Sequence, residues 1–96
     1  DTATIRDHAY LAPFVFVGHH AEVGAGATMA ARSSIHGAAR LGACAYAGSH
    51  SAVKDGITIG EGAVLGMGSV VVRDVPPRVT VVGNPARVVP GPGAGE

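Results

Sequence analysis

Cysteine, charge and long apolar runs are all scarce in this sequence of 96 residues. The single cysteine, Cys44, excludes an internal disulfide, and we expect it to be an inert thiol in a reducing cytoplasm. The 7 Lys and Arg residues are scattered and balanced by 7 Asp and Glu residues, which predicts neither a nucleic-acid nor an anionic-membrane partner. No apolar run approaches the roughly 20 residues that cross a bilayer. The sequence therefore predicts a cytoplasmic protein with no membrane span.

The length leaves room for one domain and for no second core. The chain begins at Asp1 rather than at Met and shows no signal-peptide pattern. We therefore expect it to be a piece of a longer protein.

What the sequence does have is a repeat of six residues. An aliphatic residue stands at every sixth position, is often followed by glycine, and usually has alanine or serine two positions before it. This period matches neither the 3.6-residue helix nor the alternation of a simple strand. It is typical of a coil of short strands separated by tight turns. The aliphatic positions are Ile5, Leu11, Val17, Val23, Met29, Ile35, Leu41, Ala47, Val53, Ile59, Leu65 and Val71.

The repeat has a direct geometric reading. If three repeats form one triangular turn, residues 18 apart stack at the strand spacing of about 4.8 Å. The aliphatic residues then point inward and the small residues occupy the corners. Glycine relieves the backbone where the chain bends or needs a positive φ. We therefore predict an all-β fold, a single-stranded parallel β-helix over residues 1–72.

The period breaks after Val71. Pro76 and Pro77 remove hydrogen-bond donors from the ladder, so we expect the solenoid to end there. Residues 73–89 are predicted to form a short C-terminal extension, with a strand at 79–82 and a turn at 83–85. Residues 90–96 are rich in Gly and Pro and are predicted to be a flexible tail.

Three segments near the end of the repeat carry a family resemblance. They are Gly-Met-Gly-Ser-Val-Val at 66–71, Asp-Val-Pro-Pro at 74–77 and Gly-Asn-Pro-Ala-Arg at 83–87. With the hexad run, they resemble the hexapeptide-repeat acyltransferases, most closely the sialic-acid O-acetyltransferase-like group and the nucleotide-amino-sugar N-acetyltransferases. The resemblance implies a left-handed coil, acetyl-CoA as co-substrate, a sugar-like acceptor, and a homotrimer with the coenzyme in a groove between subunits.

Residues 17–24, Val-Gly-His-His-Ala-Glu-Val-Gly, match the catalytic turn of that family. The match implies that His19 is the catalytic histidine, with His20 standing where the family has Asp or Glu. Geometry leads to the same choice, because Gly37 follows His19 by 18 residues and would lie one coil above it, about 5 Å away. A neutral imidazole suits a general base, and a glycine amide suits the stabilisation of an oxyanion. We predict His19 as the base and Gly37 as the oxyanion donor.

Other residues are weaker candidates for the site. Glu22 is a nearby carboxylate and our second catalytic candidate, although stacking places it under Arg40, where a surface ion pair is the alternative. Thr28 falls on a family histidine near the pantetheine arm. His36 is either a coenzyme contact or a solvated turn residue. The expected cofactor-binding set is Gly37, Thr28, His36, Gly66 and Arg87, and Arg87 is paired with Arg73 as a donor to coenzyme phosphates or as a solvated residue.

The leading hypothesis is thus an acyl-CoA-dependent acyltransferase, most simply an acetyltransferase, acting on an amino or hydroxyl group. Two alternatives stay open. One is a non-catalytic trimeric scaffold, which the departure at His20 favours. The other is a zinc enzyme like the γ-class carbonic anhydrases, which would need three converging histidines. No pair of histidines here has the short spacing expected of that family, so we predict no metal site.

Overall fold

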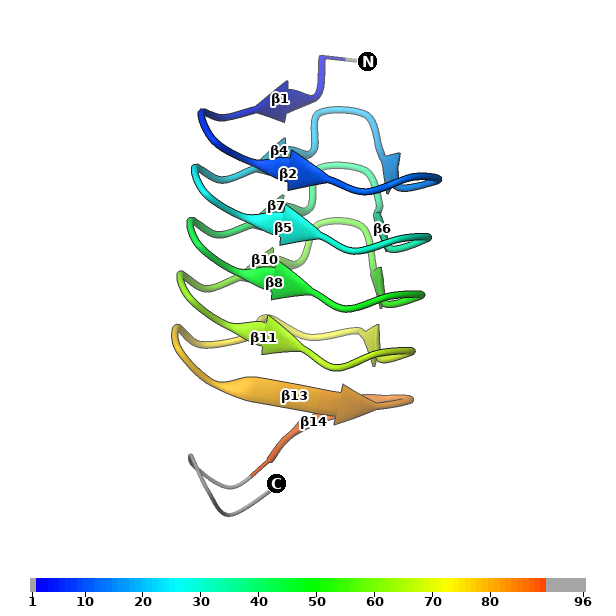
Figure 1. Cartoon of the computed structure of the whole chain (residues 1–96). Coiled ribbons are helices and arrows are strands. Elements are labelled where there is room, and N and C mark those ends of the chain that lie inside the picture. The colour runs from blue at the N-terminus through cyan, green and yellow to red at the C-terminus, as the bar shows by residue number, and fades with distance from the viewer. Residues whose placement is uncertain (1, 90–96) are drawn as a thin grey trace.

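Short strands account for all the regular secondary structure in residues 2–89, the part of the chain that the computed structural model describes. Each of the first twelve strands has two residues and ends on one of the repeated aliphatic positions. Two longer strands follow at the C-terminal end (Figure 1). The tail expected at 90–96 lies outside the described residues. The strands are β1 (Thr4–Ile5), β2 (Tyr10–Leu11), β3 (Phe16–Val17), β4 (Glu22–Val23), β5 (Thr28–Met29), β6 (Ser34–Ile35), β7 (Arg40–Leu41), β8 (Tyr46–Ala47), β9 (Ala52–Val53), β10 (Thr58–Ile59), β11 (Val64–Leu65), β12 (Val70–Val71), β13 (Thr80–Gly83) and β14 (Ala86–Val88).

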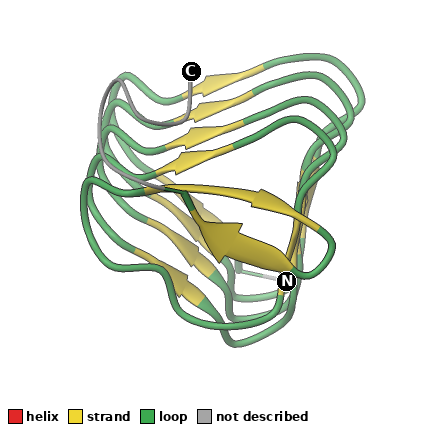
Figure 2. Cartoon of the chain, turned by 90° about the horizontal axis from the view of Figure 1, so that it is seen from below, coloured by secondary structure: helices red, strands yellow, loops and turns green. Residues whose placement is uncertain are grey.

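Every third strand stacks on the same face of a triangular prism (Figure 2). Face A holds β1, β4, β7 and β10; face B holds β2, β5, β8, β11, β13 and β14; face C holds β3, β6, β9 and β12. The pairing is parallel with a step of 18 residues, as in Phe16 opposite Ser34 and Val17 opposite Ile35. As the chain descends from its N-terminus, the near strands run from left to right, which makes the coil left-handed (Figure 1). The predicted parallel β-helix and its hand are confirmed.

The repeated aliphatic residues form the core, one above another inside the prism. From Val23 to Val71 each has 2% or less of its surface exposed. The small residues before the strands are buried beside them at the corners. Three of these are serines, whose hydroxyls donate to carbonyls three residues earlier at 2.7 Å, and this satisfies a polar group inside the core. Those serines are Ser33, Ser51 and Ser69.

Glycine meets two structural requirements in the repeat, at two different positions: close approach of the next coil and a left-handed backbone conformation. Glycine directly after the aliphatic residue allows close approach of the next coil, because a Cβ on Gly18 would lie 2.6 Å from the backbone nitrogen of Gly37. The left-handed backbone position comes two residues later, where glycine is present at Gly56 but His20 and Arg32 adopt the same conformation. The positive-φ role that we expected for the glycines of the repeat therefore belongs to a neighbouring position.

Strand pairing continues past residue 72, where we expected the β-helix to give way to an extension. Val75 bridges to Ile59, and β13 pairs in parallel with β11, each with a step of 16 residues instead of 18. This last coil is two residues shorter at one corner, and the Asp74 carboxylate fills the gap by accepting a hydrogen bond from the Thr58 N–H at 2.9 Å. β14 then folds back antiparallel on β13. Pro76 and Pro77 are accommodated because they lie at a corner and not in a strand.

Candidate functional site

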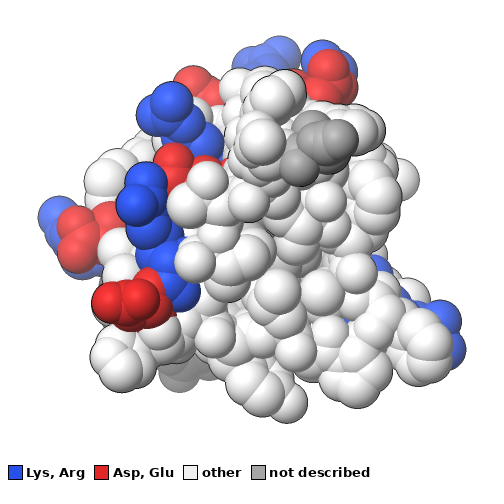
Figure 3. Space-filling view, turned by 90° about the horizontal axis from the view of Figure 1, so that it is seen from above, with Lys and Arg blue, Asp and Glu red and all other residues white. Residues whose placement is uncertain are grey.

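Charge is distributed unevenly around the prism. The outward positions of the two-residue strands on face A include Glu22 and Arg40, whereas those on faces B and C carry aromatic, aliphatic, Thr or Ser side chains. Seen from above, many of the Lys, Arg, Asp and Glu side chains in view lie along the left side, others lie at the top and at the lower right, and the middle of the surface is free of them (Figure 3). Among the two-residue strands, charged side chains are therefore confined to face A.

His19 lies exposed on the corner between faces C and A, in the turn that joins β3 to β4. Its carbonyl oxygen accepts a hydrogen bond from the Ala38 N–H at 2.7 Å. A Cβ built on Gly37 would lie 3.6 Å from the same oxygen. The 18-residue step thus places Gly37 directly over the backbone of His19, as the sequence predicted.

The Gly37 amide is available for an external acceptor. Its carbonyl accepts from the Gly56 N–H at 2.9 Å, but its own N–H has no carbonyl partner among the described residues. The equivalent amides of other turns, such as those of Ala43 and Asp55, share this property within the described range. What distinguishes Gly37 is that it has no side chain and lies over a histidine.

The His19 ring has no hydrogen-bond partner within residues 2–89. It borders a hollow of about 230 Å³ lined by Ala3, Phe16, Val17 and Gly18. The neighbouring His20 ring lies 6.5 Å away, centroid to centroid, and its Nδ1 is hydrogen bonded to Thr2 Oγ1 at 2.8 Å. No carboxylate of the described chain orients His19, so its imidazole is positioned by the backbone of the turn alone.

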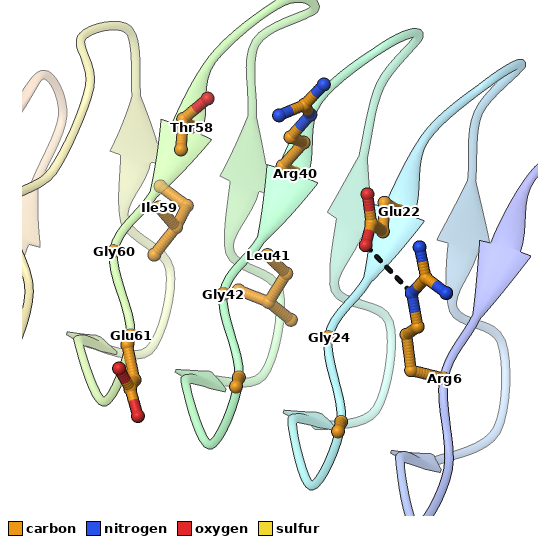
Figure 4. Close-up of a pocket in the computed structure, with 12 residues that line it drawn as sticks. Arg6, Glu22, Gly24, Arg40, Leu41, Gly42, Thr58, Ile59, Gly60 and Glu61 are labelled. Carbon is orange, nitrogen blue, oxygen red and sulfur yellow. Dashed lines mark hydrogen bonds and ion pairs between the residues drawn. The ribbon is translucent and has the colours of Figure 1, made fainter.

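The surface ion pair that the sequence offered as the alternative role of Glu22 is present, but its partner is Arg6 and not Arg40. Glu22 and Arg40 are opposite each other in the register, but the Glu22 carboxylate accepts from Arg6 Nε at 2.9 Å (Figure 4). Arg6 lies one coil earlier and two positions beyond Thr4, the residue opposite Glu22, so it is a diagonal neighbour within reach of a long side chain. These residues and Arg40 border a groove of about 360 Å³ whose floor includes Gly24 and Gly42.

His36 lies on the same corner as His19, one coil later and stacked over Gly18, and it contacts two residues of face C. Its ring is tilted by 43° against that of Phe16, with centroids 5.4 Å apart. Its Nε2 lies 3.3 Å from Ser34 Oγ. Neither Phe16 nor Ser34 was singled out from the sequence. The signal that could have found them is the register itself, because residues 16 and 34 are both outward strand positions one coil apart.

The remaining predicted contacts lie elsewhere. Thr28 is half-buried on face B, which is opposite the corner that carries His19. Gly66 lies on the corner between faces B and C, where the Val82 side chain covers it. Arg87, on β14, borders a hollow of about 280 Å³ together with Arg73, the residue that we paired with it from the sequence.

Two further searches of the described part of the chain gave negative results. No three His, Cys, Asp or Glu side chains in it converge closely enough to hold a metal ion. Nor does it contain a helix with the length and apolarity required to cross a bilayer.

Sequence comparisons relate the chain to bacterial acetyltransferases. No protein-family model matches it. A Staphylococcus aureus (strain COL) protein that carries the name acetyltransferase is 51% identical over 53 residues, which are 55% of this chain and 27% of that protein. The galactoside O-acetyltransferase of Escherichia coli K12 is 43% identical over 49 residues, 51% of this chain and 24% of the enzyme. The chain thus spans about a quarter of the length of the curated relatives that it matches.

Solved structures give the same picture over most of the chain. PerB from Caulobacter crescentus, in complex with CoA and GDP-perosamine, is 25% identical and superposes with a TM-score of 0.74 over 93% of this chain and 55% of that one. Soybean serine acetyltransferase is 31% identical, with a TM-score of 0.69 over 85% of this chain and 40% of that one. The N-acyltransferase AntD from Bacillus cereus, in complex with dTDP-4-amino-4,6-dideoxyglucose and coenzyme A, has a TM-score of 0.85 over 91% of this chain and 62% of that one, and at 19% identity it shows the fold alone. The fold and these likenesses identify the chain as a hexapeptide-repeat left-handed β-helix related to bacterial acetyltransferases.

Proposed function

We propose that the chain is the β-helix of an acetyl-CoA-dependent acyltransferase that acts on an amino or hydroxyl group of a sugar-like acceptor. The observation that supports this most directly is the stacking of Gly37 over His19 at an exposed corner of an acetyltransferase-like fold. In this proposal the base and a backbone donor without a carbonyl partner in residues 2–89 belong to stacked residues of one corner. Those are the two groups that acyl transfer from a thioester requires.

In the proposed reaction, His19 accepts the proton of the attacking nitrogen or oxygen. The lone pair of that atom forms the new bond to the thioester carbon, and the Gly37 N–H donates to the oxyanion of the tetrahedral intermediate. The carbon–sulfur bond then breaks, and coenzyme A leaves as a thiol after taking the proton back from His19. Glu22 stays our proposal for a second catalytic group, which requires its carboxylate to leave Arg6.

Coenzyme binding involves more than one corner of the prism. Arg73 and Arg87 fit a coenzyme phosphate, because two planar donors border one hollow. Gly37 and His36 would contact the reacting end. Thr28 lies on face B, opposite the corner that carries His19, so its proposed role calls for a neighbouring copy in a homotrimer. Gly66 lies next to Val82, the register partner of Arg87, so we propose it near the phosphate end of the coenzyme. A cytoplasmic location completes the proposal, since acetyl-CoA is supplied there.

Transfer of an isotopically labelled acetyl group from acetyl-CoA to a panel of amino and neutral sugars tests the proposal. His19→Ala should lower the rate by about 10²–10⁴-fold, the range typical of a lost general base. His20→Ala is the matched control, since it removes the adjacent imidazole of the same turn and should leave the rate within about threefold of wild type. Full activity in His19→Ala would remove His19 from the mechanism.

A wild-type protein that transfers no acetyl group to any acceptor would favour the scaffold alternative. The engagement of Glu22 by Arg6 is the feature of the structure most consistent with that alternative. Calorimetric titration with acetyl-CoA separates the two readings, because a scaffold should give neither heat nor protection from melting.

A further inference from the structure

The hollow beside His19 has an aromatic wall with no role in the proposed reaction. Phe16 borders this hollow and is 52% exposed, although it carries one of the larger apolar side chains of the protein. It occupies an outward position of β3, three residues before His19. Exposed apolar side chains are common on this protein, but Phe16 is one that borders the same hollow as the proposed catalytic base, and this shared position suggests contact with a ligand.

The Phe16 ring is braced from the next coil. The His36 ring contacts it at 5.4 Å between centroids, and His36 in turn lies within hydrogen-bond distance of Ser34, the register partner of Phe16. Gly18 has no side chain, and a Cβ there would strike the backbone of His36 and Gly37, so the base of the hollow stays bare. His36 and Ser34 thus support the Phe16 ring, while the side of the hollow at Gly18 has no side chain to fill it.

The chemistry of the hollow favours an uncharged ring. Among residues 2–89, none of those lining the hollow is Lys, Arg, Asp or Glu, whereas the groove on face A has Arg6, Glu22, Arg40 and Glu61 along its walls. The face of a phenyl ring carries partial negative charge and attracts the polarised C–H groups on the apolar face of a pyranose. The imidazole and hydroxyl groups of His36 and Ser34 offer neutral hydrogen bonds to sugar hydroxyls at the edge of the same wall.

We infer that Phe16 is the acceptor platform: it stacks against an uncharged pyranose ring and presents the amino or hydroxyl group of that ring to His19, while His36 positions the platform. This inference rests on the proposed acyltransferase function and narrows its acceptor class. Acyclic polyols and sugars with a carboxylate or phosphate group on the reacting ring should be poor acceptors.

Two readouts test the platform, one of which needs no turnover. Saturation-transfer NMR with methyl glucopyranoside reports contact with the ring, and the acyclic polyol sorbitol is the comparison ligand. Phe16→Ala should lose the pyranoside signal and lower kcat/KM for the pyranoside about tenfold, as expected for a lost stacking contact. The KM for acetyl-CoA should not change, and Phe16→Tyr should restore both readouts.

Phe14→Ala is the matched control. Phe14 is another exposed phenylalanine, but it lies on the corner between faces B and C, where the Arg32 guanidinium stacks over it at 4.7 Å. This variant should behave as wild type in both measurements.

Each other outcome is decisive. Equal effects of the two alanine variants, no pyranoside signal in the wild type, or a raised KM for acetyl-CoA in Phe16→Ala would overturn the platform. A change in subunit assembly in Phe16→Ala would also overturn it, by making Phe16 a subunit contact. Pyranoside binding that depends on Phe16 without any acetyl transfer would instead refute the proposed activity and leave the platform standing.

Discussion

At the corner between β12 and Val75, the carboxylate of Asp74 takes the place of a backbone carbonyl as hydrogen-bond acceptor. In the earlier coils of face A, the N–H that opens each strand donates to a carbonyl of the next coil, as Arg40 does to Ile57 at 2.9 Å. Thr58 lacks that carbonyl because the following coil is two residues shorter, and it donates to Asp74 Oδ1 at the same distance. Asp74 therefore joins the ladder across the change of repeat length.

Asp74→Ala should lower the free energy of unfolding by about 1 kcal/mol, the typical net contribution of one hydrogen bond. The loss is limited because Thr58 and Asp74 are exposed and water can solvate the freed N–H. Asp74→Asn keeps an oxygen acceptor at the same place and should lose less than half as much. Urea unfolding followed by circular dichroism measures both variants, and an equal loss in the two would show that the charge matters and not the acceptor.

The contacts of single side chains were the features that the sequence predicted least well. The period located His19 under Gly37, because backbone stacking follows from residue spacing alone. It could not locate the partner of Glu22, since Arg40 lies on one adjacent strand, Arg6 directly follows the other, and side-chain rotamers decide between them. The register sets residue 16 beside residue 34, but it does not reveal that the ring of His36, two residues further on at the corner, turns back to contact Phe16.

Each coil of the prism is stabilised mainly by the packing of its inward aliphatic side chains on those of the adjacent coils. Ile35 is fully buried between Val17 and Val53 of the adjacent coils, whereas Ile5, in the first coil, is 44% exposed. The same residue type at the same repeat position therefore has two environments.

Ile35→Ala should lower the free energy of unfolding by about 2–5 kcal/mol, because it leaves a cavity in the centre of the stack. Ile5→Ala should cost under about 1 kcal/mol, since much of its side chain is already in contact with water. Thermal and urea unfolding of the two variants side by side give the comparison. Equal losses would mean that the inner stack does not hold the coils together.

Elements were predictable where the period was unbroken. All twelve repeats became two-residue strands on the expected faces, because one spacing sets both the inward direction and the register. The continuation through Val75 and β13 was not foreseen, since a loss of two residues from one corner looks in sequence like the end of the repeat. Sequence spacing alone does not reveal that Asp74 can complete the ladder there.

At the scale of the whole molecule, the uneven charge of the prism suggests which surface meets a neighbouring subunit. Face B presents the exposed side chains Tyr10, Tyr46 and Val64, with the half-buried Thr28 between the two tyrosines. The strands β2, β5, β8 and β11 of this face include no Lys, Arg, Asp or Glu. Aromatic residues are enriched at the centre of subunit contacts and charged residues are depleted there. We propose face B as a contact surface of the homotrimer.

Tyr46→Glu should therefore dissociate the trimer, because it would bury a carboxylate without a partner in the middle of that surface. Size-exclusion chromatography with light scattering should give the mass of three chains for the wild type and of one chain for the variant. Lys54→Glu is the matched control, since it reverses a charge at the exposed corner between faces C and A, opposite face B, and should leave the mass unchanged. If the Tyr46 variant kept the wild-type mass, face B would not be the contact surface. If it became monomeric and also lost acetyl transfer while still binding the pyranoside, the coenzyme site would be completed by a neighbouring subunit, as the separation of Thr28 from His19 requires.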